Sequence, residues 1–187
     1  MKRIPILLLI MTCFIFQPLM AKKYTINKAK IEWIGKKIGG KHNGYVQLKE
    51  GFIETSKQQI HKGTFIIDMN TITCEDLTNE SLNKKLVDHL KSDDFFSVAK
   101  YPTAEIKILQ AEKFEEGKAQ ITAMATIKGI SKPITFISHK EEDGYSAHIK
   151  IDRSQFDVRY GSNSFFDNLG NKAIDDIFII NVHIVTE

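Results

Sequence analysis

The sequence predicts an all-β protein, a closed antiparallel β-barrel of about eight strands with one short α-helix. Segments in which apolar and polar residues alternate follow one another along the chain, as expected of strands with one buried face. Polar turns that contain glycine separate these segments, for example at residues 115–118 and 141–144. A long antiparallel meander exposes its edges unless it closes on itself, so a barrel is favoured.

Two local irregularities are expected within this pattern. Residues 45–53 are expected to form a hairpin whose turn lies at Lys49 and Glu50. In the last strand, Ile177 and Ile179 share one face, whereas the apolar residues that follow have the opposite parity. Such a phase slip predicts a β-bulge at this point.

The one helical segment is predicted at residues 81–91. Leucines recur there every four residues from Leu82 to Leu90, which gives the helix one apolar stripe, and Asn79 or Ser81 can cap its start. An isolated helix of this length is marginal in water, so it is expected to pack against the sheet.

The first residues have the composition of a secretory signal peptide, residues 1–21. Two basic residues precede an apolar run at residues 4–16, and Ala21 offers a small residue for cleavage. The run is short for a membrane anchor, and the residues before Cys13 do not form a lipoprotein signal. Residues 22–187 are therefore expected to form one exported domain.

Charge and cysteine content narrow the class of function. Two of the 26 basic residues lie in the predicted signal peptide, which leaves 24 against 23 acidic residues in the domain. This balance argues against a nucleic-acid partner, because binding to phosphate backbones needs a clustered basic excess. Cys74 is the one cysteine of the domain, so no internal disulfide is expected and the thiol is interpreted as a buried apolar group.

No metal or cofactor site is expected. Residues 35–42 nearly match a phosphate-binding loop, but His42 replaces the hydroxyl residue and no helix follows, so a basic hairpin is the better interpretation. The histidines lack the i, i+4 spacing or CxxC company of metal ligands. They are His42, His61, His89, His139, His148 and His183.

An enzyme is not expected either. Asp68, Asp152 and Arg153 are charged residues within strand patterns, where structural ion pairs or strand-end caps are the simpler interpretation. Neither GxSxG nor HExxH is present. An enzyme that uses Asp68, His42 or Arg153 on a lipid remains the alternative.

Five segments resemble, in order, the signature of the YceI-like family, periplasmic lipocalin-like barrels associated with polyisoprenoid binding. They are IEWIGKKIGGKHNG (31–44), GTFIIDMNTI (63–72), HLKSDDFF with YPTAEI (89–106), ATIKGISKPITF (125–136) and IDRSQFDVRYG (151–161). The resemblance implies a periplasmic or secreted protein that holds a long-chain isoprenoid or acyl lipid. It also places His42 and Arg153 at the rim of the barrel, Arg153 within a motif interpreted as structural.

The residues leave room for such a ligand, because several positions expected to face inward carry alanine. Phe165 and Phe166 lie in a loop at residues 160–170, where they either pack beneath the loop or close the mouth of the cavity. A barrel filled by its own side chains, as in a structural stress protein, is a further alternative.

Transient membrane contact is expected, and the sequence is compatible with both a monomer and a dimer. The side chains expected to contact lipid are Trp33, Phe65, Ile67, Met69, Phe95, Phe96, Ile106, Ala125, Ile127, Phe136, Ile149, Phe156, Tyr160, Phe165 and Phe166.

Overall fold

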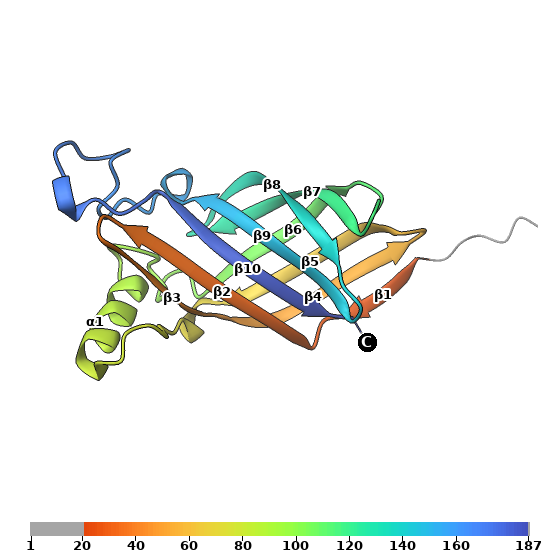
Figure 1. The fold of residues 1–187 in the computed structure, drawn as a ribbon, viewed down its shortest axis with the longest axis horizontal. Coiled ribbons are helices and arrows are strands. Elements are labelled where there is room, and N and C mark those ends of the chain that lie inside the picture. The colour runs from red at the N-terminus through yellow and green to blue at the C-terminus, as the bar shows by residue number, and fades with distance from the viewer. Residues whose placement is uncertain (1–20, 187) are drawn as a thin grey trace, which may run out of the picture.

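The structure is a computed structural model that describes residues 21–186, so the predicted signal peptide lies outside the described residues apart from Ala21. A single antiparallel sheet forms most of the molecule (Figure 1). The strands are β1 (Lys22–Thr25), β2 (Lys28–Lys37), β3 (Gly40–Tyr45), β4 (Gln47–Ser56), β5 (Gln59–Asp68), β6 (Thr103–Ala111), β7 (Lys118–Ile127), β8 (Ile130–Lys140), β9 (Gly144–Asp152) and β10 (Ile177–Val185). The helices are α1 (Glu80–Lys91) and the short 3-10 turns η1 (Met69–Thr71), η2 (Arg153–Phe156) and η3 (Gly170–Lys172).

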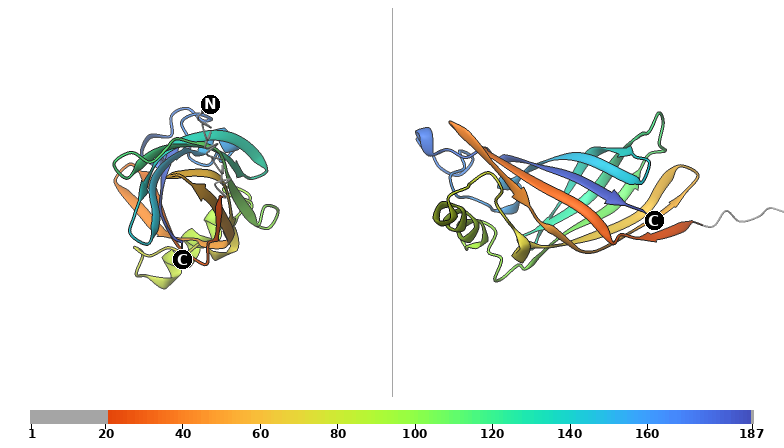
Figure 2. Two further views of the ribbon diagram at one scale, coloured as in Figure 1. Left: turned by 90° about the vertical axis from the view of Figure 1, so that its right-hand side faces the viewer. Right: turned by 60° about the horizontal axis from the view of Figure 1, so that its bottom comes forward.

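The sheet is rolled around its long axis (Figure 2). Its strand order is β1-β4-β5-β6-β7-β8-β9-β10-β2-β3, so β1 and β3 are its two edges and no ladder among the described residues joins them. The ten strands correspond to about eight extended segments of the chain, because β1 continues into β2 and β3 continues into β4 after short interruptions. The all-β antiparallel fold with one helix is therefore confirmed, whereas closure of the barrel by strand pairing is not shown.

The β1–β2 stretch and the β3–β4 stretch meet along a seam, where two further backbone hydrogen bonds continue the β2–β3 and β1–β4 ladders. The Val46 N–H donates to the Ile31 carbonyl at 3.1 Å, and the Ile26 N–H donates to the Gly51 carbonyl at 2.8 Å. Between these two bonds β2 and β4 diverge, and an outer groove lies along the seam. The seam is thus paired by the β2–β3 ladder on one side and by the β1–β4 ladder on the other, with an unpaired stretch between them.

Both predicted irregularities are wrong. Residues 47–56 form one strand, β4, and a register shift lies where the hairpin turn was expected, between Leu48 and Glu50. The pairing of β10 with β9 and with β2 is regular throughout, so no bulge occurs near residue 179. The regular alternation instead places Ile177 on the outer face, where 38% of it is exposed.

The free edge of β3 is covered by the segment at residues 71–76. Three alternate backbone N–H groups, two on β3 and one at the start of β4, donate to side-chain oxygens of the segment: Asn43 to Asp76, Tyr45 to Thr73, and Gln47 to Thr71, at 2.8–3.1 Å. These bonds occupy donors that an exposed edge would otherwise offer to another chain. The approach is close enough to require glycine, because a Cβ on Gly44 would lie 2.0 Å from the Thr73 carbonyl oxygen.

Helix α1 lies at one end of the rolled sheet, near the β2–β3 turn and the loop between η2 and β10 (Figure 1). The Asn79 side chain caps its first turn by accepting from the Leu82 N–H at 3.0 Å, as one of the two predicted caps. The leucine stripe is only partly buried against the sheet, since Leu90 is buried whereas Leu82 is 55% exposed. Within residues 21–186, no helix is long and apolar enough to cross a membrane.

Candidate functional site

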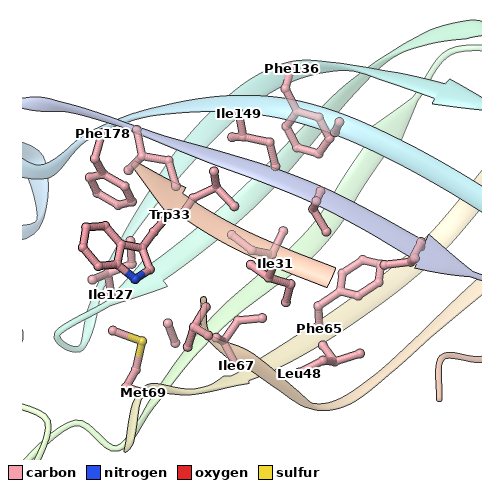
Figure 3. A pocket seen from close by; sticks show the side chains of 18 of the residues that line it. Ile31, Trp33, Leu48, Phe65, Ile67, Met69, Ile127, Phe136, Ile149 and Phe178 are labelled. Atoms are coloured by element: carbon pink, nitrogen blue, oxygen red, sulfur yellow. The ribbon is translucent and has the colours of Figure 1, made fainter. Parts of the chain in front are cut away.

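An apolar cavity of about 210 Å³ lies inside the rolled sheet (Figure 3). Alternate residues of β2 and of every strand from β4 to β10 line it, together with Leu90 of α1. The lining extends from Phe95 and Arg153 at the helix end to Ile60 and Tyr145 near the opposite turns. Apart from a few polar groups such as Ser138 and Asp175, its surface is aliphatic and aromatic, so it favours an apolar guest.

Ten of the fifteen side chains predicted to contact lipid line this cavity: Trp33, Phe65, Ile67, Met69, Phe95, Phe96, Ile106, Ile127, Phe136 and Ile149. Two others, Ala125 and Phe156, are buried in the neighbouring core cluster and do not line it. The remaining three, Tyr160, Phe165 and Phe166, lie exposed on the loop at the helix end. Contact of any of these residues with a ligand stays a prediction.

Several lining residues were missed by the sequence reasoning. The largest group lies on β10, where Phe178, Ile180, Val182 and Ile184 all face the cavity. Their common parity was the available signal, and the bulge that was expected there obscured it. Ile31 shares the parity of Trp33 on β2, so the same signal was available for it, whereas Leu48 lies beside the register shift of β4.

Aromatic rings gather at the helix end of the cavity. Phe95, Phe96 and Phe178 meet edge to face, with ring centroids 5.0 and 6.3 Å apart along this series. The His89 ring of α1 joins Phe95 to Tyr160 of the exposed loop, at centroid distances of 5.9 and 4.3 Å. Edge-to-face pairs stabilise beyond their buried area, so this series fixes α1 and the loop against the sheet.

Arg153 is the polar anchor of the same end and is 1% exposed. Its guanidinium donates to four carbonyl oxygens, those of Val158, Tyr160, Ile174 and Asp175, at 2.8–3.0 Å. A fifth contact, 3.4 Å from Nη2 to Asp176 Oδ1, is an ion pair that lacks hydrogen-bond geometry. The predicted rim residue is therefore a buried structural anchor whose donors are occupied, so it has little left to offer a ligand.

Burial and charge act on this pair in opposite directions. Burial lowers the pKa of Arg153, while the nearby carboxylates of Asp176, Asp175 and Asp152 raise it; burial prevails. Burial would raise the pKa of Asp176, but hydrogen bonds from Ser162 and Ser164 and the charge of Arg153 together hold it below its ordinary value. The carboxylate is thus kept ionised beside the guanidinium.

The other predicted polar residues have local structural roles. Asp68 accepts from the Asn70 N–H at the start of η1, and Asp152 accepts from the Ser154 N–H at the start of η2. His42, on β3, makes a 2.8 Å contact with Asp76 at the helix end. These bonds match the strand-end caps and ion pairs expected from the sequence.

The family model of the YceI-like domain matches residues 24–186. The chain belongs to the YceI-like family. Among curated relatives, UPF0312 protein VPA0850 of Vibrio parahaemolyticus is 27% identical over 138 residues, which cover 67% of this chain and 73% of the relative. A UPF0312 protein of Shewanella denitrificans is 26% identical over 95 residues, about half of either chain (51% and 47%).

Solved structures of similar fold include Burkholderia cenocepacia BcnA, with a TM-score of 0.65 and 20% identity over 85% of this chain and 96% of that one. A YceI protein of Campylobacter jejuni matches with a TM-score of 0.54 and 23% identity, over 76% and 85%. YceI-like proteins are lipocalin-like binding proteins that take hydrophobic ligands and are not known as enzymes. The apolar lining of the cavity fits that class.

Proposed function

We propose that this YceI-like protein is exported to the periplasm or the medium and holds the tail of a single-chain amphiphile, an isoprenoid or acyl lipid, for transport, storage or stress response. The observation that carries the proposal is the cavity, which is enclosed by the sheet and lined almost wholly by apolar side chains. Such a site needs no directional chemistry, because transfer of each methylene from water contributes about 0.8 kcal/mol.

The size of the cavity sharpens the proposal. At about 30 Å³ per small group, the share of liquid volume taken by a water molecule, 210 Å³ corresponds to at least about seven methylene-sized groups. Their burial gives about 6 kcal/mol in total, before the cost of immobilising the chain. A tail much longer than the cavity, such as that of a long polyisoprenoid, would leave part of its length at the mouth unless the cavity widens.

A series of fatty acids of increasing length tests this proposal, with native mass spectrometry and the fluorescence of Trp33 as readouts. Trp33 is the one tryptophan of the chain and lines the cavity, so its emission should change on loading. We expect affinity to rise with each added methylene, up to about the length that the cavity accommodates. A plateau there indicates a tail held within the present walls, and a continued rise indicates widening.

Neighbouring residues of β8 provide the matched control. Phe136 lines the cavity, whereas Ile137 faces outward and is 44% exposed. Phe136→Asp should abolish lipid uptake, while Ile137→Asp should leave it within about twofold, since surface changes have small effects. Equal uptake by both folded variants would show that Phe136 does not contact the lipid. A wild-type chain that neither carries extractable lipid nor takes up added lipid would favour the alternative of a filled barrel.

The helix end offers a route for loading from a membrane surface. Ile38, Phe165 and Phe166 are exposed there, with basic side chains such as Lys37 and Arg159 alongside. Apolar side chains with basic neighbours suit the interface of an anionic bilayer. Phe165→Ser with Phe166→Ser should reduce sedimentation with phosphatidylglycerol vesicles, whereas Leu109→Ser, on β6, should not.

A further inference from the structure

Three potential metal ligands that are distant in sequence meet beside the covered edge of β3. His42 comes from β3, and Cys74 and Asp76 come from the segment that lies over it. One ligand atom of each lies within 4.8 Å of the other two. The sequence did not predict this group, because His42 is separated from the other two by more than thirty residues and lacks the usual ligand spacing.

We propose that His42, Cys74 and Asp76 form a zinc site, with one imidazole, one thiolate and one carboxylate ligand and a fourth position open to water. This ligand set is one that Zn²⁺ uses, and three protein ligands with an open position are typical of sites where the metal exchanges a further ligand. The proposal is independent of lipid binding, since none of the three residues lines the cavity.

The spacing of the donors is close to what zinc requires. In a tetrahedral site with bonds of about 2.0–2.3 Å, ligand atoms lie about 3.3–3.6 Å apart. Here His42 Nδ1 is 2.8 Å from Asp76 Oδ2, and one ligand atom of each of the three residues lies within 4.8 Å of the other two. Side-chain shifts of up to about 1 Å bring the three ligand atoms to these separations.

The surroundings hold the ligands in place. The Asn43 N–H donates to Asp76 Oδ1 at 2.9 Å, which orients the carboxylate so that Oδ2 faces His42 Nδ1, the second proposed ligand atom. The carbonyl of Cys74 accepts from the Asn83 side chain of α1 at 2.8 Å. His42 and Asp76 have side chains that are 26% and 29% exposed, so an ion can enter from solvent while the thiol stays buried.

Cobalt(II) is the direct probe, because a bound thiolate gives a thiolate-to-cobalt charge-transfer absorption that other ligands do not. The full chain, with its thiols kept reduced, is titrated with CoCl₂, and ZnCl₂ is then added to displace the cobalt. We expect one equivalent to develop the band and quench Trp33. The indole Nε1 donates to the Thr73 carbonyl at 2.9 Å, directly beside Cys74.

Two matched variants separate this site from general metal binding. Cys13→Ser removes the other thiol of the sequence, and His183→Gln breaks a second His–Asp pair, His183 with Asp143 at 2.9 Å, which has no cysteine. Both should keep the band. Cys74→Ser should abolish it, and His42→Gln should weaken zinc affinity more than about tenfold.

Circular dichroism and urea unfolding without metal establish whether each variant is folded. If His42→Gln does not fold, Cys74→Ser, a near-isosteric change, tests the zinc site by itself. The proposal is overturned if the wild-type band is absent at stoichiometric cobalt, if it survives in Cys74→Ser, or if His183→Gln weakens zinc as much as His42→Gln does.

Discussion

The wall of the rolled sheet and the end that carries α1 are stabilised in different ways. In the wall, β7 alternates buried and partly exposed residues along nearly its whole length, and many aliphatic contacts each contribute a part of the stability. At the helix end, the loop after η2 depends on one buried guanidinium, and the β3 edge depends on a few side-chain and backbone hydrogen bonds to the covering segment. The wall should therefore tolerate single changes better than the end does.

The largest effect is expected at Arg153. Arg153→Met leaves four carbonyls and the partly buried Asp176 without their partner, and removal of one member of a buried pair costs about 3–5 kcal/mol. Arg159→Met is the control, because its ion pair with Asp157 is 60% exposed on the arginine side and should contribute less than about 1 kcal/mol. Urea unfolding of both variants measures the difference, and similar values would show that Arg153 is not the anchor.

A wall residue provides the second half of the comparison. Ile121 of β7 is 1% exposed and borders the cavity, so Ile121→Ala should cost about 2–4 kcal/mol through lost burial and an enlarged void. Gln120→Ala, its exposed neighbour, should change the free energy of unfolding by less than about 0.5 kcal/mol. If Ile121→Ala exceeds Arg153→Met, the wall is the more sensitive region and the comparison is reversed.

The sequence predicted the wall better than the end for the same physical reason. Strand parity is a local signal, and it placed Phe65, Ile106 and Ile127 on the cavity face. The cover over β3 is made by hydrogen bonds between residues 24–33 positions apart, such as Gln47 with Thr71, and no periodicity records them. Parity failed on β10, where a run of apolar residues on both faces imitated a bulge, and on β4, where a register shift imitated a hairpin turn.

Two glycines of β3 test how closely the covering segment is fitted. Gly44→Ala places a methyl group against the Thr73 backbone, which cannot move without disturbing the edge, so we expect a loss of about 1–3 kcal/mol. Gly40→Ala on the same strand meets nothing within 4 Å and should be nearly neutral. Hydrogen exchange at Asn43 and Tyr45 adds a local readout, since their N–H groups donate to the cover. Unchanged protection in Gly44→Ala would mean that the cover contributes little.

The smallest effect is the acid dependence contributed by Asp176. Its carboxylate accepts from Ser164 Oγ at 2.6 Å and lies beside Arg153, and its pKa is held below the ordinary value of 3.8. A carboxyl with a lowered pKa stabilises the folded state above the unfolded value, and this stability is lost as the pH falls through the folded pKa. The stability advantage of wild type over Asp176→Asn should therefore be full near neutral pH and shrink below about pH 4.

Urea midpoints of the two proteins at a series of pH values measure this advantage directly. Asp88→Asn is the control, because the Asp88 side chain is 60% exposed in its pair with Lys84 and such surface pairs contribute little at any pH. A gap between wild type and Asp176→Asn that stays constant into acid would assign the effect of Asp176 to its hydrogen bonds alone. The helix end would then be held by neutral contacts, as the wall is, and the charge of Arg153 would matter less than its geometry.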